Sequence, residues 1–255
     1  MFPLISHPSW LQLLLFVVCC GHLTITAMSL YLHRSQTHQS VQFAPAVSHF
    51  FRFVLWFFSS TLTKVWVAIH RLHHSTTDKI NDPHSPQWYG IWHIFFLGWN
   101  NYRLESKNIE TIRSYGSGTP DDWIEKNVYT RYKYWGLLFF LPLLDCALFG
   151  YLGLLVWLGH VIWVPLWASG VVNGLGHYVG YRNYATKDES RNVSPIGLSF
   201  LTSGEVFHNN HHGDANNPKF SRRWFEFDIG WFYIDMLVLF GLAKLTKTKR
   251  KPLPA

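Results

Sequence analysis

The sequence predicts an all-α, polytopic membrane protein, in which about three transmembrane helices and interfacial helices support a cytoplasmic helical cap. Of the 255 residues, 48% are apolar and 18% are aromatic, and they are concentrated in long blocks separated by polar segments. A helix needs roughly 20 apolar residues to cross a hydrocarbon core of about 30 Å. Residues 10–32 predict the first span, because these 23 residues contain no Asp, Glu, Lys or Arg.

The second apolar block is long enough for two spans. Residues 134–178 comprise 45 positions with one carboxylate and neither Lys nor Arg. Gly150 and Gly153 lie near the middle of the block, and glycine readily adopts the backbone conformations of a tight turn. We therefore expect two spans joined by a turn near these glycines, at about 134–155 and 156–178.

A further apolar segment, residues 43–69, is expected not to cross the membrane. Histidine motifs flank it, because one ends at His38 and the next begins at His70. If the segment crossed the bilayer, these motifs would lie on opposite sides and could not share a site. Arg52 and Lys64 also interrupt its apolar character. We therefore predict an interfacial helix at about 43–69, which lies on the membrane surface or dips into it.

Charge placement predicts the orientation of the chain. All 22 Lys and Arg residues fall within 34–133 and 182–251. Cytoplasmic segments of membrane proteins carry an excess of these residues, so we expect cytoplasmic parts at 33–133 and 179–255 and an external N-terminus. The whole chain, 1–255, is expected to form one membrane domain. Cytoplasmic loops that face anionic lipid explain the net charge of +7, and no nucleic-acid partner is expected.

Eight histidines form three motifs with the spacing of metal ligands. One motif is HxxxxH and two are HxxHH, and their members are His33, His38, His70, His73, His74, His208, His211 and His212. Residues at i, i+3 and i+4 share a helix face, so each HxxHH motif is expected to direct three imidazoles toward one point. Eight histidines exceed the four ligands of one structural ion and predict a dinuclear centre. Imidazole suits iron, zinc, copper and nickel, and iron makes such a centre useful for oxygen chemistry.

The first motif fits a regular helix less well than the other two. His33 and His38 are five residues apart, which separates them by about 140° around a helix of 3.6 residues per turn. We therefore expect a helix end or a local distortion at this motif.

The remaining histidines are expected to be structural. His84 lies in a turn-like Asn-Asp-Pro-His sequence, where a structural role is favoured over metal binding. Five other histidines lack neighbours with ligand spacing, and they are His7, His22, His49, His93 and His160.

At the three motifs, the sequence resembles the integral-membrane fatty acyl desaturases of the acyl-CoA Δ9 type, close to their bacterial members. The 31 residues between His38 and His70 match the spacing of that family. Residues that flank the motifs also match, and they are Tyr31-Leu-His33-Arg34, Trp66, Asn81-Asp-Pro-His84, Gly204-Glu205 and the segment from Trp224 to Leu242.

The resemblance implies a ninth metal ligand and further residues at the centre. His177, four residues after Asn173, matches a family ligand, and Asn173 matches a residue that holds a metal-bound water. The implied site is therefore a nine-histidine centre with two iron ions. Glu205, just before the third motif, is a candidate to orient a ligand histidine through its second nitrogen, with helix capping or a salt bridge as equal alternatives.

The family resemblance also implies an activity. It is the oxygen-dependent insertion of a cis double bond into a saturated acyl chain, with an acyl-CoA thioester as the first expectation and a bacterial inner membrane as the location. Acyl-carrier-protein thioesters and lipid-bound chains stay open, because Ala68-Ile69 and Pro86-Gln87 stand where animal acyl-CoA enzymes carry charged pairs. An acyl or alkyl hydroxylase on the same di-iron scaffold is the nearest alternative, and a membrane metal transporter is a remote one.

The activity requires electrons from outside the chain. The sequence contains no dinucleotide fingerprint, and its three cysteines all lie in apolar spans, so an iron–sulfur site is not expected. We expect a separate electron-transfer protein as a partner, which would be a ferredoxin, a cytochrome or an NAD(P)H-dependent reductase.

Overall fold

The computed structural model describes residues 3–193 and 196–246, and it confirms the predicted all-α membrane class. The α-helices are α1 (Trp10–Ala27), α2 (Pro45–Ser59), α3 (Thr63–Thr76), α4 (Pro86–Tyr89), α5 (Ile91–Glu105), α6 (Ile109–Tyr115), α7 (Leu141–Phe149), α8 (Gly153–Val164), α9 (Ile196–Thr202), α10 (His208–Gly213) and α11 (Ile229–Leu239). The π-helices are η1 (Met28–Thr37), η2 (Glu125–Thr130), η3 (Gly136–Phe140) and η5 (Pro165–Gly174), and the 3₁₀ turns are η4 (Gly150–Leu152) and η6 (Leu175–His177).

Two helical runs are long and apolar enough to cross a membrane. The first covers Trp10–Thr37 and the second covers Gly136–His177, and the count rises to three if α2 and α3 form one broken span. Ser9 caps the start of the first run, because its hydroxyl accepts from the Gln12 amide while the Gln12 side chain accepts from the Ser9 amide. This reciprocal cap satisfies two backbone donors that would otherwise have no partner at the end of the helix.

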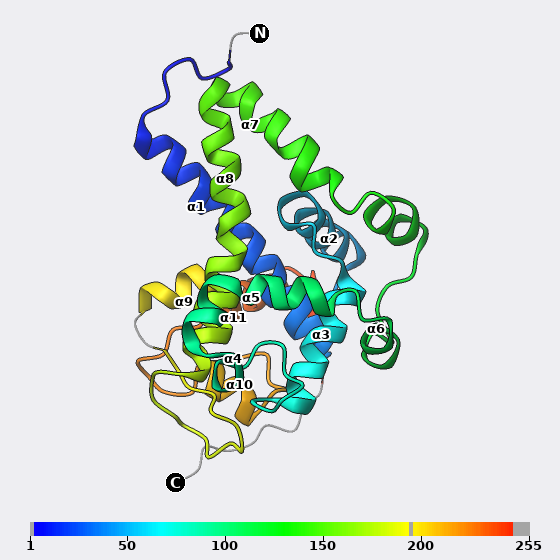
Figure 1. Cartoon of the computed structure of the whole chain (residues 1–255), viewed down its shortest axis with the longest axis vertical. Helices are drawn as coiled ribbons and strands as arrows, with labels where there is room; N and C mark the ends of the chain where they lie inside the picture. Colours follow the sequence, from blue (N-terminus) through cyan, green and yellow to red (C-terminus); the bar gives the residue numbers. More distant parts are fainter. Residues whose placement is uncertain (1–2, 194–195, 247–255) are drawn as a thin grey trace.

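The second run folds back on itself at Gly150, as the sequence predicts, so that α7 and α8 meet at this turn and diverge away from it (Figure 1). Gly150 has a φ of +64°, which glycine adopts without steric cost. A Cβ at Gly153 would lie 2.2 Å from the Asp145 carbonyl oxygen, so the two helices approach closely at this point. Farther along, the Trp157 indole donates to the Leu137 carbonyl oxygen at 2.7 Å.

The segment predicted as one interfacial helix over 43–69 is divided into two helices, α2 and α3, at an angle of 86°. The helix ends because Ser60 adopts a left-handed conformation with a φ of 55°, and Leu62 is extended. This bend turns α3 away from α2 and brings the second histidine motif to the first, where the ring centroids of His33 and His70 are 4.4 Å apart.

The cap contains α10, α11, the loop 178–193 and a small two-stranded sheet that the sequence does not predict. In this sheet β1 (Val41–Phe43) pairs antiparallel with β2 (Ala243–Leu245). A buried core that includes Tyr31, Leu55 and Ile234 joins η1, α2 and α11. Figure 1 shows α10 at the opposite end of the molecule from the turn between α7 and α8. Residues 1–2, 194–195 and 247–255 of the predicted domain, with the end of the basic tail, lie outside the described residues.

Candidate metal centre

The first histidine motif lies on a π-helix, which confirms the predicted distortion. The His38 amide donates to the His33 carbonyl at 3.1 Å, and this i+5 to i hydrogen bond spans one residue more than the i+4 to i bond of an α-helix. His33 and His38 thereby come to the same side of η1, with ring centroids 5.0 Å apart. The π-helix explains why a five-residue spacing can serve one site.

All nine predicted histidines meet in two neighbouring groups. Within each group, one nitrogen from every member lies within 4.8 Å of the others. The larger group, called group A, comprises His33, His38, His70, His74 and His211. The smaller, group B, comprises His73, His177, His208 and His212.

The expectation that each HxxHH motif directs three imidazoles toward one point is wrong. In α3, His70 and His74 belong to group A, whereas His73 belongs to group B. In α10, His211 belongs to group A, whereas its neighbour His212 belongs to group B. Adjacent residues are separated by about 100° around a helix, so each motif straddles the line between the two groups and supplies both.

The ring nitrogens face one another at the distances expected of ligands that share an ion. The Nε2 atom of His211 lies 2.9 Å from that of His33 and 3.0 Å from that of His74. In group B, the Nε2 atoms of His208 and His177 are 3.0 Å apart. Protein imidazoles bind metal at about 2.0–2.1 Å, so pairs of nitrogens near 3 Å leave space for one ion between them.

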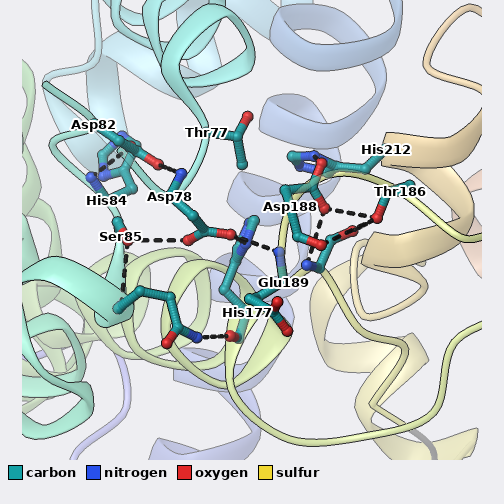
Figure 2. Close-up of polar contacts among 12 residues, drawn as sticks. Thr77, Asp78, Asp82, His84, Ser85, His177, Thr186, Asp188, Glu189 and His212 are labelled. Atoms are coloured by element: carbon teal, nitrogen blue, oxygen red, sulfur yellow. Dashed lines mark hydrogen bonds and ion pairs between the residues drawn. The ribbon is translucent and has the colours of Figure 1, made fainter. Parts of the chain in front are cut away.

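Carboxylates bind the far side of four rings. The Nδ1 atom lies 2.6 Å from a carboxylate oxygen in the pair His33–Glu205, 2.9 Å in His73–Asp82, 3.0 Å in His177–Asp78 and 3.1 Å in His212–Asp188. A proton on Nδ1 leaves the Nε2 lone pair to face a metal ion, as in known carboxylate–histidine–metal arrangements. Figure 2 shows Asp78 and Asp188 beside His177 and His212.

The pair His73 and His212 tests whether the residues fit a cation. Each ring contacts a carboxylate through Nδ1, and the two Nε2 atoms face each other at 3.4 Å. With both Nδ1 atoms protonated, the two neutral rings would point their Nε2 lone pairs at each other, and neither Nε2 could donate a hydrogen bond. A cation between them satisfies both. The buried Nε2 of His38 also has no hydrogen-bond partner among the described residues, so the donor set fits metal ions.

Electrostatics favour neutral rings and charged carboxylates. Burial, aided by neighbouring histidines, lowers the pKa of His208 and His211 well below its ordinary value. Burial likewise lowers the pKa of His212 to about 4, against the opposing effect of Asp188. Burial alone would raise the pKa of Asp188, but its hydrogen bond from His212 holds it well below the usual range. Neutral imidazole is the form that binds metal.

Asparagines inside the third motif hold the loop that carries Asp188. The Asn209 side chain accepts from the backbone amides of Asn183 and Tyr184, each at 2.8 Å, and donates to the Tyr184 carbonyl. Its neighbour Asn210 exchanges hydrogen bonds with Asn192 at 2.9 and 3.1 Å. Both side chains are fully buried, so losing one of these hydrogen bonds would leave a buried polar group unpaired and destabilise the fold. The motif therefore positions an orienting carboxylate as well as the ligands.

A buried arginine links Glu205 to the rest of the cap. Arg34 donates to Asp228 at 3.0 Å and lies 3.8 Å above the Phe220 ring. Its guanidinium is also 3.6 Å from Glu205, and the Ser29 hydroxyl donates to the same carboxylate. Burial alone would raise the pKa of Glu205, but His33 and Arg34 hold it below the usual value.

The sequence did not single out three of the four orienting carboxylates. Asp82 belongs to the Asn81-Asp-Pro-His84 flank of the second motif, and no motif includes Asp78 or Asp188. His84 is buried beside His73, with ring centroids 5.8 Å apart, but it lies outside both groups. The five histidines expected to be structural also lie outside them among the described residues, for example His22, whose Nε2 is 2.9 Å from the Tyr233 hydroxyl.

A cavity of about 420 Å³ extends from the histidines toward the helical hairpin. His33, His70 and His208 line its inner end, together with Asn173. Its walls come mainly from apolar side chains of η1, the α2–α3 bend, α5, α8 and η5. This volume and lining are typical of a site for a small, largely apolar ligand.

Three histidine motifs that could hold metal ions lie beside an apolar cavity, in a chain whose helices are long and apolar enough to cross a membrane. Residues 8–220 match the fatty acid desaturase family model. The chain belongs to the fatty acid desaturase family, and its activity is that of a fatty acyl desaturase.

Known relatives include acyl-CoA and acyl-lipid enzymes. The chain is 33% identical over 240 residues to an acyl-CoA 5-desaturase of Anemone leveillei, which covers 92% of this chain and 70% of that protein. It is 31% identical to Delta-9 acyl-lipid desaturase 1 of Arabidopsis thaliana, over 91% of this chain and 73% of that one. It is 32% identical to the sn-1 stearoyl-lipid 9-desaturase of Synechocystis sp., over 70% of this chain and 54% of that one.

Replacing Asp188 with asparagine is expected to weaken metal binding about 10–100-fold, the usual effect of losing an orienting partner. The amide has one oxygen, whereas Asp188 uses both: one for His212, the other for Thr186 and the Ser190 amide. Chelator titration of the loaded protein measures the effect. Glu189→Gln is the matched control, because the Glu189 side chain pairs with surface arginines. Equal metal retention by both variants would contradict the role assigned to Asp188.

Proposed function

We propose that this chain is an oxygen-dependent desaturase that places a cis double bond in a saturated acyl chain, with two iron ions held by nine histidines. The division of these histidines into two adjacent groups at the inner end of an apolar cavity carries the proposal. Five imidazoles would hold one ion and four would hold the other. Asn173, which lines the same cavity as His208, would hold a metal-bound water.

The overall reaction sets what the chain must provide. Removing one hydrogen from each of two adjacent methylenes while O2 is reduced to two waters consumes two further electrons and two protons. Bound iron would supply the oxygen-activating chemistry. Since these electrons come neither from the substrate nor from the three single cysteines, a separate ferredoxin, cytochrome or NAD(P)H-dependent reductase is the proposed partner.

The residues of the chain itself would position the acyl chain and exclude water. Trp66 stacks on His70 with ring centroids 4.7 Å apart, and both line the cavity. Ile69 and Val172 add apolar surface beside the histidines. A chain in this cavity would present one pair of carbons to the metal site, and binding energy along the rest of the chain would fix the register. Relatives of both the acyl-CoA and the acyl-lipid class are consistent with an acyl substrate of either kind.

The loaded enzyme is expected to contain two metal ions per chain. Metal analysis measures their number, and intact mass spectrometry of the product distinguishes a desaturase, which removes two hydrogens, from a hydroxylase, which adds one oxygen. Chelation should abolish activity and iron should restore it. Zinc in overexpressed protein would not contradict the proposal, because affinity alone does not select iron. One ion or fewer in fully loaded protein would refute the dinuclear site.

Replacing any one of the nine histidines with alanine is expected to abolish desaturation, whereas His7→Ala, His49→Ala or His93→Ala should leave most of it. Asn173→Ala should lower activity by about 10–100-fold and keep both metals, because the proposed link from Asn173 to the metal runs through water. Activity and metal content are measured on the same preparations. Loss of one metal in Asn173→Ala would show that this side chain is a ligand or is needed for folding.

The proposed location is a bacterial inner membrane with the histidine site on the cytoplasmic side. Tags at the N-terminus and near Gly150 are therefore expected to be accessible from outside the membrane. Tags after His38, after His74 and at the C-terminus should be accessible only from the cytoplasm. Positions near His38 and His74 on opposite sides would refute the three-span arrangement.

A further inference from the structure

Two ionisable residues lie inside the helical hairpin, apart from the histidine groups. Asp145 on α7 and His160 on α8 are 0% and 3% exposed, and the His160 Nδ1 atom lies 3.4 Å from Asp145 Oδ2. Asp145 is the only charged residue of either helix, and neither member of the pair belongs to group A or group B. Ionisable groups inside membrane segments are costly and commonly mark a functional position.

His160 also lines the cavity that reaches the metal centre. On α8 and η5, the lining positions recur every three or four residues from His160 to Asn173, so they share one face of the helical run. Of the α8 residues in this lining, His160 is the farthest along the helix from Asn173. Their separation of 13 residues corresponds to on the order of 20 Å along a helix. His160 therefore faces a part of the cavity that is remote from the metal centre.

One nitrogen of His160 is left without a partner on this wall. Asp145 lies on the Nδ1 side of the ring, whereas Nε2 has no hydrogen-bond partner among residues 3–193 and 196–246. Two aromatic rings flank the imidazole, since Phe58 and Phe16 have ring centroids 5.6 and 5.8 Å from it. A buried polar atom is normally paired, and a ligand site typically adds a few placed polar groups to an apolar pocket. Nε2 can therefore bind a polar group of the ligand.

A hydroxyl is the polar group that suits this position. Nε2 accepts a hydrogen bond when the neutral ring carries its proton on Nδ1, and it donates one when the ring is an imidazolium. A hydroxyl both donates and accepts, so it pairs with Nε2 in either state, whereas a methyl or methylene group pairs in neither. A carboxylate or phosphate would bring a further charge into the apolar hairpin, which is costly.

We propose that His160, held by Asp145, binds a hydroxyl near the methyl end of the acyl chain, so that hydroxylated chains are preferred over plain ones. This inference rests on the proposed desaturase function and names the kind of chain on which it acts. The hydroxyl takes no part in the reaction. Its hydrogen bond fixes the far end of the chain, and thereby the pair of methylenes that meets the metal centre.

Amide substitutions separate this role from a purely structural one. A pair that only ties α7 to α8 uses Nδ1, whereas the proposed subsite uses Nε2. The amide of asparagine lies near the position of Nδ1, and the longer glutamine reaches that of Nε2. His160→Asn thus keeps a partner for Asp145 and removes the group that faces the cavity, whereas His160→Gln keeps a polar group at the cavity wall.

A feeding experiment measures the preference. Cells without a desaturase of their own express the chain and receive equal amounts of stearic acid and ω-hydroxystearic acid, which they activate and esterify. The saponified products are weighed by mass spectrometry, and the unsaturated share of each chain gives the preference. The host loads both chains in the same way for every variant, so differences between variants report on the protein. Affinity of purified, metal-loaded protein for the two acids, measured by calorimetry, gives a readout that does not depend on turnover.

The unaltered protein is expected to favour the hydroxylated chain about tenfold, in line with one hydrogen bond in a buried site. His160→Asn should remove this preference by slowing the hydroxylated chain alone, and His160→Gln should keep part of it. His93→Asn is the matched control, because His93 bonds to Asn101 outside the cavity lining. Metal content of all variants reports on correct folding.

Two results would overturn the subsite and leave the desaturase function intact. One is equal use of the two chains by the unaltered protein. The other is an unchanged preference in folded, metal-loaded His160→Asn. If the unaltered protein binds ω-hydroxystearic acid about tenfold more tightly than stearic acid but desaturates neither, the desaturase function fails and the subsite stands.

Discussion

The convergence of nine histidines on two adjacent points is the constraint on which the rest of the structure depends. The nine rings come from segments that are far apart in the sequence, and several of their ring nitrogens lie about 3 Å from one another. A buried polar atom left without a partner costs about 1–3 kcal/mol, so this arrangement is unfavourable unless cations satisfy the lone pairs. The helix distortions bring the rings together, and the buried carboxylates orient them.

Three structural features build this arrangement. The π-helix η1 turns His33 and His38 to one side. The bend at Ser60 carries α3 toward η1. The buried asparagines of α10 hold the loop that supplies Asp188. In each case local backbone regularity gives way to the geometry of the site, as is common where function imposes its own requirements.

The sequence predicted the fold class, eight of the nine histidines and the distortion at His33 and His38, because each leaves a local pattern in composition or spacing. The ninth histidine, His177, has no such pattern and was implied only by the family resemblance. The 86° bend between α2 and α3 was not predicted, since hydropathy is insensitive to one left-handed residue. The division of each HxxHH motif between two groups depends on the directions from which other helices approach. Asp78 and Asp188 act on rings 99 and 24 residues away, and no single-sequence pattern links positions so far apart.

Because α3 and α10 each contribute histidines to both groups, group A and group B are not mechanically independent. His73 and His74 are consecutive residues, as are His211 and His212, yet each neighbour serves the other group. The backbone of these two helical segments therefore sets the distance between group A and group B, and no bridging side chain is needed to do so. A shift of either helix would move histidines of both groups. Group A and group B are therefore expected to lose their arrangement together, in one cooperative step.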